Sequence, residues 1–502
     1  SYPLAKTRLD NLLREGVLYF NYSGHGGYNN ITNEGMMSIK DVQTMKNENQ
    51  AFWMFATCSF AHFDSGKRSA AEEAVLNPNG GAIGVFSACR TVYAKQNTDL
   101  NRNLCDTLFG HKNVFHYDMH LGDATSRAKN KTGHQINKLA YILLGDPALR
   151  LNYPSELQVT TTTKLDTLNA LTAHQIEGFI QEEDMSKADW FNGRLSITIY
   201  DKLQKITTRD NDEKNPKEQV LLTYNDYPNI IYRGETNVTN GAFKYTFMTP
   251  KDIRYNYGNG RIVYYAYDEM EAAEGIGHFH DFIVGGSSEN IIVDTQGPDI
   301  RLYLNHEGFQ NGEKSYETPR VFAAIYDENG INTAGSGIGH DIMLTVDNNP
   351  NLSYNINEYF SFDLDTYQSG MVSYLLPELT DGPHTLSLRA WDLVNNSSTA
   401  TINFEVVHGI DPTIFSVASF IRGNIMYLYV QYDQPDQLLE TEVYVYNPQG
   451  QLCYTHKQNN ADEIRIDLNR MGLANGLYLY NVVLKTEKGN HASKAGKIMV
   501  HP

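Results

Sequence analysis

Two short apolar runs near the start of the chain predict neighbouring β-strands. Residues 17–22 (VLYFNY) and 51–57 (AFWMFAT) are rich in β-branched and aromatic residues, with turn-forming residues around them, a pattern typical of strands buried on both faces. Between them, Ser38 and Asp41 form a helix-capping signature, and apolar residues recur at helical spacing over 39–45. This order of strand, helix and strand predicts a right-handed crossover in a parallel sheet, so that both strands end at one edge.

Beyond Pro154 the pattern changes to alternation of apolar and polar residues, as over 195–200 and 261–267, which predicts β-sandwiches. A charged segment, 201–230, is expected to be an inserted loop. We therefore expect a multidomain chain in which a partial caspase-like α/β domain with a parallel sheet precedes Ig-like β-sandwich domains. The expected domains are residues 1–153, 154–296, 297–408 and 409–502. Within the first domain we also expect helices over 4–15, 98–109 and 121–130, a helix capped by Ser69 with Glu72, and strands over 82–87 and 141–144.

Length and composition narrow the class of protein. With 502 residues the chain is too long for one core. Its net charge of −18, without a basic tract, argues against a nucleic-acid partner. Its four cysteines form no evident disulfide framework, although a pair between Cys89 and Cys105 stays open. No apolar run reaches the length of a membrane span and no signal peptide opens the chain.

The two predicted strands lead into residues that suit nucleophilic catalysis. The first is followed by Ser23-Gly24-His25-Gly26-Gly27 and the second by Thr57-Cys58-Ser59. A lone histidine or cysteine is usually structural, but an imidazole beside a thiol accepts its proton and makes it a strong nucleophile. Backbone N–H groups of the glycines and of Cys58 are suited to bind an oxyanion. The expected catalytic residues are His25 and Cys58, and the expected oxyanion and pocket residues are Gly24, Gly26, Gly27, Ser59 and Arg90.

Several neighbouring residues have ordinary alternatives. His62 is a competing base, but we favour a loop histidine that shapes the pocket. Arg90 and Tyr93 follow the third strand and contact substrate in one interpretation, whereas a salt bridge and a packed ring explain them equally well. Cys89 lines the site or packs in the core, and we favour packing.

The motifs resemble a known family. GHGG after one strand and ATCSF after the next resemble the gingipain family of caspase-like cysteine peptidases. The segments SAAEEAVLNPNGGAIGVFSACRTVYAKQN, LGDATSRAKN and NKLAYILLGDPALRL are similar to the sortases of the type IX secretion system of Bacteroidota. The resemblance extends over the whole chain. It implies that His25 is the general base and Cys58 the nucleophile, with no cofactor and no catalytic metal.

One part of the family pattern is missing. Gingipain-like enzymes carry acidic residues and sheet strands upstream of the histidine, whereas this sequence has only two dozen residues before His25. We do not assign Asp64, Glu72 or Glu73 to that role, because loop and helix-surface charges explain them. The expectation is that this chain is the C-terminal portion of a longer protein, whose N-terminal remainder supplies the acid.

A second candidate site lies in the β-rich part. Asp327–Gly330 and Gly335–Asp341 are rich in glycine and oxygen-bearing side chains, which suits a structural Ca²⁺ ion. The spacing does not fit an EF-hand, and we favour solvated turns.

The end of the chain, NGLYLYNVVLKTEKGNHASKAGKIMV, resembles the C-terminal sorting domain of type IX secretion cargo. Docking on the export machinery is favoured over an ordinary terminal Ig-like domain. The resemblance thus implies a sortase at the extracellular face of the outer membrane. It would cleave the sorting domain from cargo and transfer the cargo to anionic lipopolysaccharide, with residues 409–502 held by an outer-membrane shuttle or tether protein. A secreted gingipain-like endopeptidase and a non-catalytic adhesin or scaffold are the alternatives.

Overall fold

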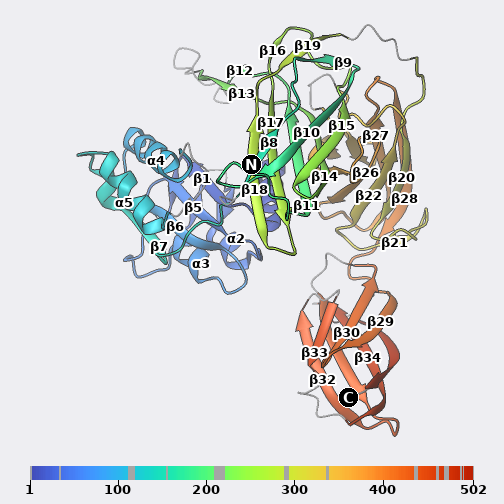
Figure 1. Cartoon of the computed structure of the whole chain (residues 1–502). Helices are drawn as coiled ribbons and strands as arrows, with labels where there is room; N and C mark the ends of the chain where they lie inside the picture. The colour runs from blue at the N-terminus through green and yellow to red at the C-terminus, as the bar shows by residue number, and fades with distance from the viewer. Residues whose placement is uncertain are drawn as a thin grey trace. The chain divides into compact units, whose positions relative to one another are not determined.

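The computed structural model describes the chain in two compact units, which are treated separately below (Figure 1). The first unit comprises Ser1–Gln158 with Glu182–Met185, and the second comprises Val159–Gln181 with Ser186–Pro502. Within these bounds the described residues are 3–32, 35–110, 119–153, 157–208, 221–287, 293–334, 339–434, 439–459, 463–467, 474–486, 489 and 491–500.

The first unit is built on a sheet that is parallel, as expected, except for its last strand, which runs antiparallel and makes the sheet mixed. Its strands are in the order β1, β5, β6, β7. β1 is parallel to β5 and β5 to β6, whereas β7 runs antiparallel to β6. The strand–helix–strand prediction is therefore confirmed, and β1 and β5 end at the same edge. The bounds are β1 Tyr19–Ser23, β5 Ala51–Ala56, β6 Ala82–Ala88 and β7 Tyr141–Gly145, with short strands β2 Gly26–Gly27, β3 Asn30–Ile31 and β4 Met37–Ser38.

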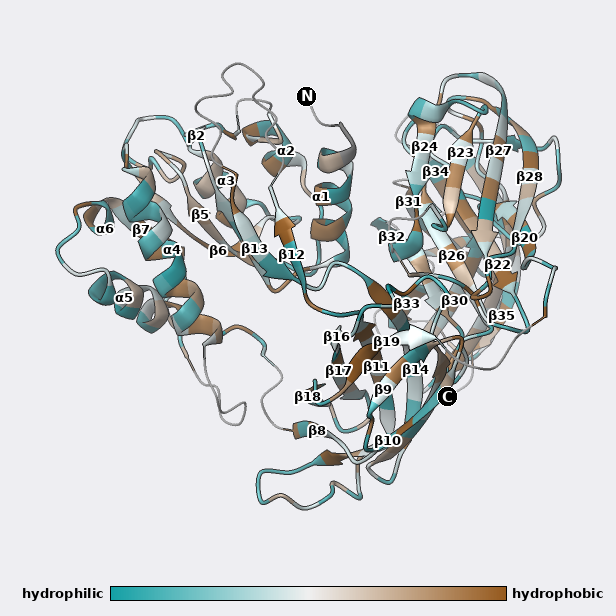
Figure 2. Ribbon diagram, turned by 90° about the horizontal axis from the view of Figure 1, so that it is seen from above, coloured by the Kyte–Doolittle hydropathy of each residue, from teal (hydrophilic) through white to brown (hydrophobic). Residues whose placement is uncertain are grey.

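Helices cover both faces of this sheet (Figures 1 and 2). One core cluster joins Trp53, Phe55 and Val85 of the sheet to apolar residues of α1, α2 and α3. The other joins Met54 and Phe86 to leucines and alanines of α4 and α5. Because both faces of the sheet are covered, the central strand β5 is a continuous run of apolar residues. The helices are α1 Pro3–Glu15, α2 Ile39–Thr44, α3 Ala70–Leu76, α4 Ala94–Phe109, α5 Leu121–Lys131 and α6 Asn137–Ala140.

Two helix starts match their sequence signatures. Ser38 caps α2 and Asp41 bonds back to it, and Ser69 and Glu72 do the same at α3. Each capping box satisfies donors that the first turn of a helix leaves unpaired.

The expectation that both early strands are buried on two faces is half right. All six residues of β5 are buried. In β1, Asn21 and Ser23 are exposed, because β1 is at one end of the four-stranded sheet and β5 is its one partner there.

The second unit begins with the expected β-rich part, but its main sheet closes into a barrel instead of forming two open sheets. The barrel order is β10-β15-β14-β11-β17-β18-β8. Within the charged segment 201–230, β12 and β13 pair as a separate ribbon. The bounds are β8 Leu157–Thr161, β9 Thr167–Ala170, β10 Ala173–Gln181, β11 Gly193–Tyr200, β12 Gln204–Thr207, β13 Thr223–Asp226, β14 Ile230–Thr239, β15 Ala242–Met248, β16 Gly258–Asn259, β17 Arg261–Asp268, β18 Ala273–Phe279 and β19 Ile283–Ser287.

Two further β-domains follow, each with two sheets. In the first, a four-stranded sheet, β20-β22-β26-β25, accompanies a five-stranded sheet, β21-β28-β27-β23-β24. In the second, β29-β30-β33 accompanies β32-β31-β34-β35, around one apolar core. The bounds are β20 Asp299–Leu304, β21 Lys314–Ser315, β22 Arg320–Tyr326, β23 Met343–Val346, η1 Pro350–Leu352, β24 Ser353–Asn355, η2 Asn357–Tyr359, β25 Phe360–Phe362, β26 Ser369–Leu375, β27 Gly382–Trp391, β28 Ser397–Val406, β29 Ile414–Arg422, β30 Ile425–Tyr432, β31 Leu439–Tyr446, β32 Leu452–Asn459, β33 Glu463–Asp467, β34 Gly476–Thr486 and β35 His491–Val500.

Candidate active site

Hydrogen bonds of the backbone hold the segment that carries His25 in place. The carbonyl oxygen of His25 accepts hydrogen bonds from the Tyr22 hydroxyl at 2.6 Å and from the Thr32 N–H at 2.9 Å. The Gly24 N–H donates to the Ala56 carbonyl oxygen at 3.3 Å. The His25 side chain is exposed, so a firmly held backbone presents an imidazole to solvent beside the end of β5.

The three glycines around His25 differ in whether their N–H groups are already hydrogen-bonded. The hydrogen bond from the Thr32 N–H to the His25 carbonyl oxygen makes these two residues a hydrogen-bonded pair. In the next two pairs of the hairpin, Gly26 lies opposite Ile31 and Gly27 lies opposite Asn30. Hydrogen-bonded and non-bonded pairs alternate in an antiparallel ladder. The Gly26 N–H therefore faces away from β3, whereas Gly27 belongs to the next bonded pair. Of the expected glycine donors, Gly26 is the one whose N–H has no backbone partner among the described residues.

Gly26 also lies against the residue that precedes the cysteine. A Cβ atom on Gly26 would come within 2.6 Å of the Thr57 Oγ1 atom and 3.1 Å of the Asn30 carbonyl oxygen. The backbone therefore approaches Thr57 more closely than any side chain would permit.

Cys58 lies in a tight turn after β5. Its side chain is half-buried, and its Sγ atom donates to the Val92 carbonyl oxygen at 3.7 Å. The next residue, Ser59, has a left-handed backbone with φ of 55°, which is unusual for a residue with a side chain. Its N–H donates to the Arg90 carbonyl oxygen at 3.1 Å. Ser59 is thus adjacent to Cys58, but its amide is already bonded.

The strand register relates His25 to Cys58. Ser23 pairs with Ala56 in the parallel ladder of β1 and β5, and Ala56 belongs to the core under α4 and α5. His25 and Cys58 each follow the last residue pair of this register by two positions. The contacts of Gly24 and Gly26 with residues 56 and 57 keep the two segments adjacent beyond the strand ends.

The rim residue Arg90 forms a salt bridge. Its guanidinium binds both carboxylate oxygens of Asp64, at 2.9 and 2.5 Å, and these hydrogen bonds lower the pKa of Asp64. The His62 Nε2 atom lies 3.4 Å from the same carboxylate. Tyr93 is 68% exposed, which excludes the packed ring considered from the sequence. In this structure Arg90 is therefore engaged with Asp64, and Tyr93 faces solvent.

All four cysteines are free thiols, so the pair between Cys89 and Cys105 that the sequence left open is not formed. The Cys89 N–H bonds to the Ala140 carbonyl oxygen at the end of β6. The Cys105 sulfur on α4 lies 3.6 Å from the Asn21 Nδ2 atom of β1.

Tyr141 and Lys129, which contact one another, carry no functional signal in the sequence. Tyr141 opens β7 and is fully buried, and burial, with a smaller effect of the Cys58 charge, raises the pKa of its hydroxyl. The Lys129 Nζ atom of α5 donates to the Tyr141 carbonyl oxygen at 2.5 Å, and burial lowers the pKa of Lys129. Both residues are far from Cys58 in the sequence, and their own contact follows from the packing of α5 on β7.

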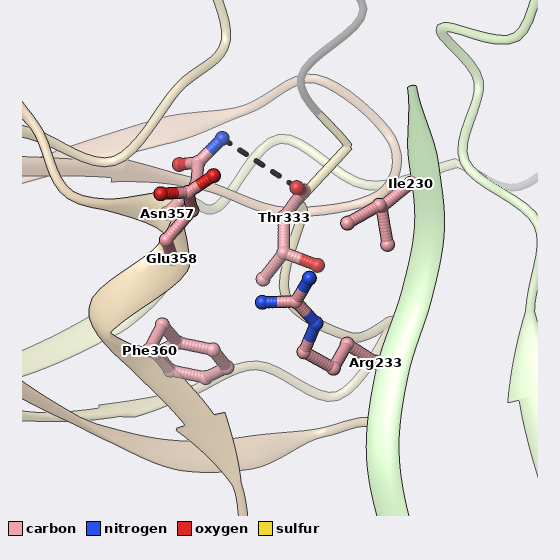
Figure 3. A pocket seen from close by; sticks show the side chains of 6 residues that line it. All are labelled: Ile230, Arg233, Thr333, Asn357, Glu358 and Phe360. Carbon is pink, nitrogen blue, oxygen red and sulfur yellow. Dashed lines mark hydrogen bonds between the residues drawn. The ribbon is translucent and has the colours of Figure 1, made fainter. Parts of the chain in front are cut away.

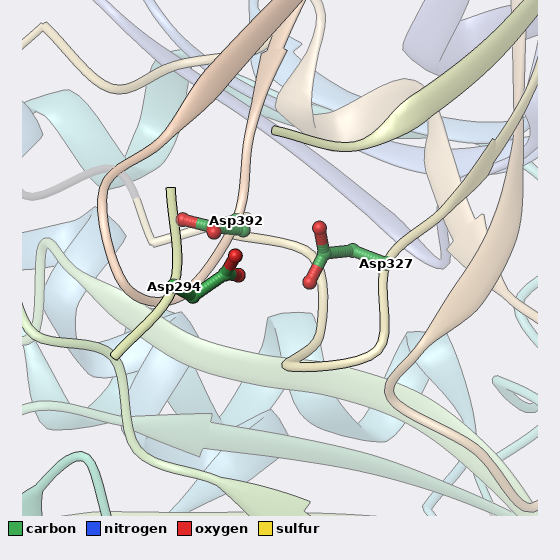
Figure 4. A group of neighbouring side chains, drawn as sticks. All are labelled: Asp294, Asp327 and Asp392. Atoms are coloured by element: carbon green, nitrogen blue, oxygen red, sulfur yellow. The ribbon is translucent and has the colours of Figure 1, made fainter. Parts of the chain in front are cut away.

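Among the described residues, the acidic cluster that could hold a metal ion includes Asp327 of the first predicted loop and two residues from outside both loops. Asp327 lies with Asp294 and Asp392, and a carboxylate oxygen from each lies within 4.8 Å of the others (Figure 4). Burial raises the pKa of Asp327 to about 6, whereas backbone bonding to Gln296 lowers the pKa of Asp294. Residues 335–338 of the second loop lie outside the described residues. The Ca²⁺ expectation therefore stays a prediction.

A pocket in the second unit is lined by residues of the barrel and of the following sandwich (Figure 3). Its polar wall includes the Asn357 side chain, which donates to the Thr333 carbonyl oxygen at 3.5 Å. It contains neither His25 nor Cys58. The lining residues are Ile230, Arg233, Thr333, Asn357, Glu358 and Phe360.

Over the described residues, no helix is both long and apolar enough to cross a membrane.

Comparison with known proteins gives a family match for the first domain. Residues 1–152 match the model of peptidase family C25. No curated protein matches the chain. The crystal structure of dimeric latent PorU from Porphyromonas gingivalis is 29% identical, with 84% of this chain and 41% of that chain covered and a TM-score of 0.34. The complex of the pro- and mature domains of RgpB from the same organism is 14% identical, with 56% of this chain and 57% of that chain covered and a TM-score of 0.27.

The chain thus spans less than half of the PorU chain that it matches. The family match covers the segment that carries His25, Cys58 and the mixed sheet. Residues 1–152 therefore form a domain of peptidase family C25, the gingipain family of cysteine peptidases.

Proposed function

We propose that the chain is a cysteine peptidase in which Cys58 is the nucleophile and His25 the general base. The observation that carries the proposal is the parallel register of β1 and β5, which ends with Ser23 beside Ala56, two residues before His25 and Cys58. Together with the family match, this register supports an imidazole and a thiol at one sheet edge.

The proposed reaction begins when the Cys58 sulfur bonds to the carbonyl carbon of the scissile peptide and His25 accepts the thiol proton. His25 then gives that proton to the leaving nitrogen as the C–N bond breaks, and a thioester remains on Cys58. Water or an amine attacks the thioester and restores the thiol. The N–H groups of Gly26 and Cys58 are the proposed donors to the oxyanion.

Labelling with a peptidyl acyloxymethyl ketone tests this proposal, because the reagent needs an activated cysteine. The full chain is expected to be labelled at Cys58, and Cys58→Ala or His25→Ala is expected to abolish the labelling. The matched control variants are Cys453→Ala, which removes an exposed thiol, and His62→Ala, which removes the competing base. Retained labelling in His25→Ala together with loss in His62→Ala would reassign the base, and an inert Cys58 would favour a scaffold.

We further propose that the substrate is the junction before the sorting domain of type IX secretion cargo. In this proposal the acyl group passes to an amine of anionic lipopolysaccharide at the extracellular face of the outer membrane. The sequence resemblance supports this role, as does the terminal hairpin, in which β34 and β35 pair from Gly476 with Val500 to Lys485 with His491. The hairpin belongs to the module that we propose is held by an outer-membrane shuttle or tether protein.

Cleavage specificity separates the sortase from the secreted endopeptidase. The sortase is expected to cut added cargo once, at the junction before the sorting domain, and to spare unfolded casein. Degradation of casein at many sites would instead favour the endopeptidase. In both cases Cys58→Ala is the inactive control.

A further inference from the structure

Tyr141 has a buried hydroxyl that the described part of the chain leaves without a hydrogen-bond partner. The residue pairs with Ala88 across β6 and β7, and its ring lies 5.4 Å from that of Phe86. Its side chain is 0% exposed, and its Oη atom makes no hydrogen bond to the residues that the structure describes. A buried hydroxyl without a partner is unfavourable, so it requires a physical explanation.

Tyr141 and Cys58 flank the end of the same strand. On one side of β6 the Cys89 N–H bonds to the Ala140 carbonyl oxygen, and on the other side the Ser59 N–H bonds to the Arg90 carbonyl oxygen. Tyr141 belongs to the core under α4 and α5, as does the residue two positions before Cys58. Burial raises the pKa of the Tyr141 hydroxyl, and the charge of a Cys58 thiolate raises it further. The hydroxyl thus stays protonated, and so remains a donor, within electrostatic range of the sulfur.

The present partner of the Cys58 sulfur suits only the neutral thiol. The thiol donates to the Val92 carbonyl oxygen at 3.7 Å. A thiolate has no proton to donate, and a carbonyl oxygen repels its charge, so the reactive form needs hydrogen-bond donors instead. Rotation about the Cα–Cβ bond of Cys58 moves the sulfur away from Val92 without a change in the backbone.

We propose that the buried Tyr141 hydroxyl donates a hydrogen bond to the Cys58 thiolate and so holds the nucleophile in its reactive form. This assignment rests on the proposed function, in which Cys58 is the nucleophile, and deepens it. Tyr141 is then a positioning residue that acts through Cys58. It accounts for the hydroxyl without a partner in the described structure, at a residue that faces the Cys58 turn across the end of β6.

Other titratable and charged groups lie on the elements that carry or flank Cys58 and Tyr141. His25 follows β1, Arg90 and its partner Asp64 follow β6 and β5, and Lys129 of α5 bonds to the Tyr141 backbone. Cys89 follows β6 and interacts electrostatically with Lys129. A change that removes the Tyr141 hydroxyl alone leaves all of these groups in place, so it isolates the proposed hydrogen bond.

The test is the pH profile of Cys58 alkylation by iodoacetamide in the full chain, measured by peptide mass spectrometry from pH 4 to 10. Tyr141→Phe is expected to move the inflection upward by about one pH unit, a tenfold loss in thiolate at lower pH. Incorporation of 3-fluorotyrosine at position 141 is expected to move it downward, because a more acidic hydroxyl is a stronger donor. Tyr316→Phe, at a buried tyrosine of the second unit, is the matched control.

A purely structural role gives a different result. Removal of an unpartnered buried hydroxyl would then leave the protein as stable as before, or more so, and the profiles of both Tyr141 variants would superimpose on that of the wild type. That result would overturn the inference alone. If Cys58 in the unmodified chain reacts no faster than the exposed Cys453, the proposed function fails and the inference fails with it. If Tyr141→Phe does not fold, the fluorotyrosine shift decides.

Discussion

Gly26→Ala is the substitution whose effect follows most directly from the geometry. The new Cβ atom would lie 2.6 Å from Thr57 Oγ1 and 3.2 Å from Thr57 Cγ2, whereas ordinary contacts begin at 3.4 Å. One side must therefore move by about 0.8 Å to reach that distance. Thr57 is 1% exposed and has little space, so we expect a cost of about 1–3 kcal/mol in folding free energy, as for other overpacked sites.

The same displacement is expected to disturb the proposed reaction. Thr57 directly precedes Cys58, and Gly26 directly follows His25, so the movement separates the base from the nucleophile. A misplacement of about 1 Å can cost about 10²-fold in rate. The expected rate of acylation by the peptidyl acyloxymethyl ketone is therefore about one hundredth of that of the wild type.

Gly27→Ala is the matched control, because its Cβ atom would meet nothing closer than the Asn30 Oδ1 atom at 3.6 Å. We expect this variant to label at nearly the wild-type rate and to melt at nearly the same temperature. Equal rates for Gly26→Ala and the wild type would refute the close-approach reasoning. Equal losses in both variants would show that the hairpin tolerates no side chain, whatever its distance from Thr57.

Three further predictions concern stability. Burial lowers the pKa of His174 to about 4, so only the unfolded chain protonates between pH 6.5 and 4. Stability is therefore lost as the pH falls through that window, by up to about 3 kcal/mol. His174→Leu should reduce the loss in urea titrations at pH 7 and 4.5, and an unchanged loss would contradict this. Ser69→Ala removes the cap of α3 and should lower the free energy of unfolding of the first unit by about 1 kcal/mol, whereas an unchanged urea midpoint would argue against the cap. Burial raises the pKa of Asp327 to about 6, so stability falls as the pH rises from 4 to 6, and Asp327→Asn should raise the melting temperature at pH 7.5 more than at pH 4.5. Calcium chloride, added in that assay, tests the Ca²⁺ expectation, since a bound ion would raise the melting temperature of the wild type but not that of Asp327→Asn.

Much of the first domain could be predicted because its signals are local. The apolar runs that became β1 and β5, and the capping boxes at Ser38 and Ser69, each depend on residues within a few positions of one another. Alternation likewise predicted the later strands. It did not predict that β8 and β10 would close a barrel, because a strand with one buried face reads the same in a sandwich and in a barrel.

Some features of the candidate site could likewise be predicted from local sequence, whereas others depend on the tertiary structure. His25 and Cys58 could be predicted as candidates because each follows a strand at a shared sheet edge, and the crossover rule makes those strands parallel. The difference among Gly24, Gly26 and Gly27 depends on which amide a neighbouring strand already binds. The salt bridge of Arg90 depends on a loop conformation that no short pattern encodes.

The sequence by itself determined which strands carry the imidazole and the thiol, because short-range periodicity and chain connectivity are sufficient to order them along one sheet. The tertiary structure alone decided which strands flank the one that ends beside Cys58. Tyr141 lies 83 residues after Cys58 in the sequence, and the two flank β6 because β7 joins the sheet antiparallel to β6. Long-range pairing of this kind is set by the packing of the whole domain, so it leaves no signature near either residue.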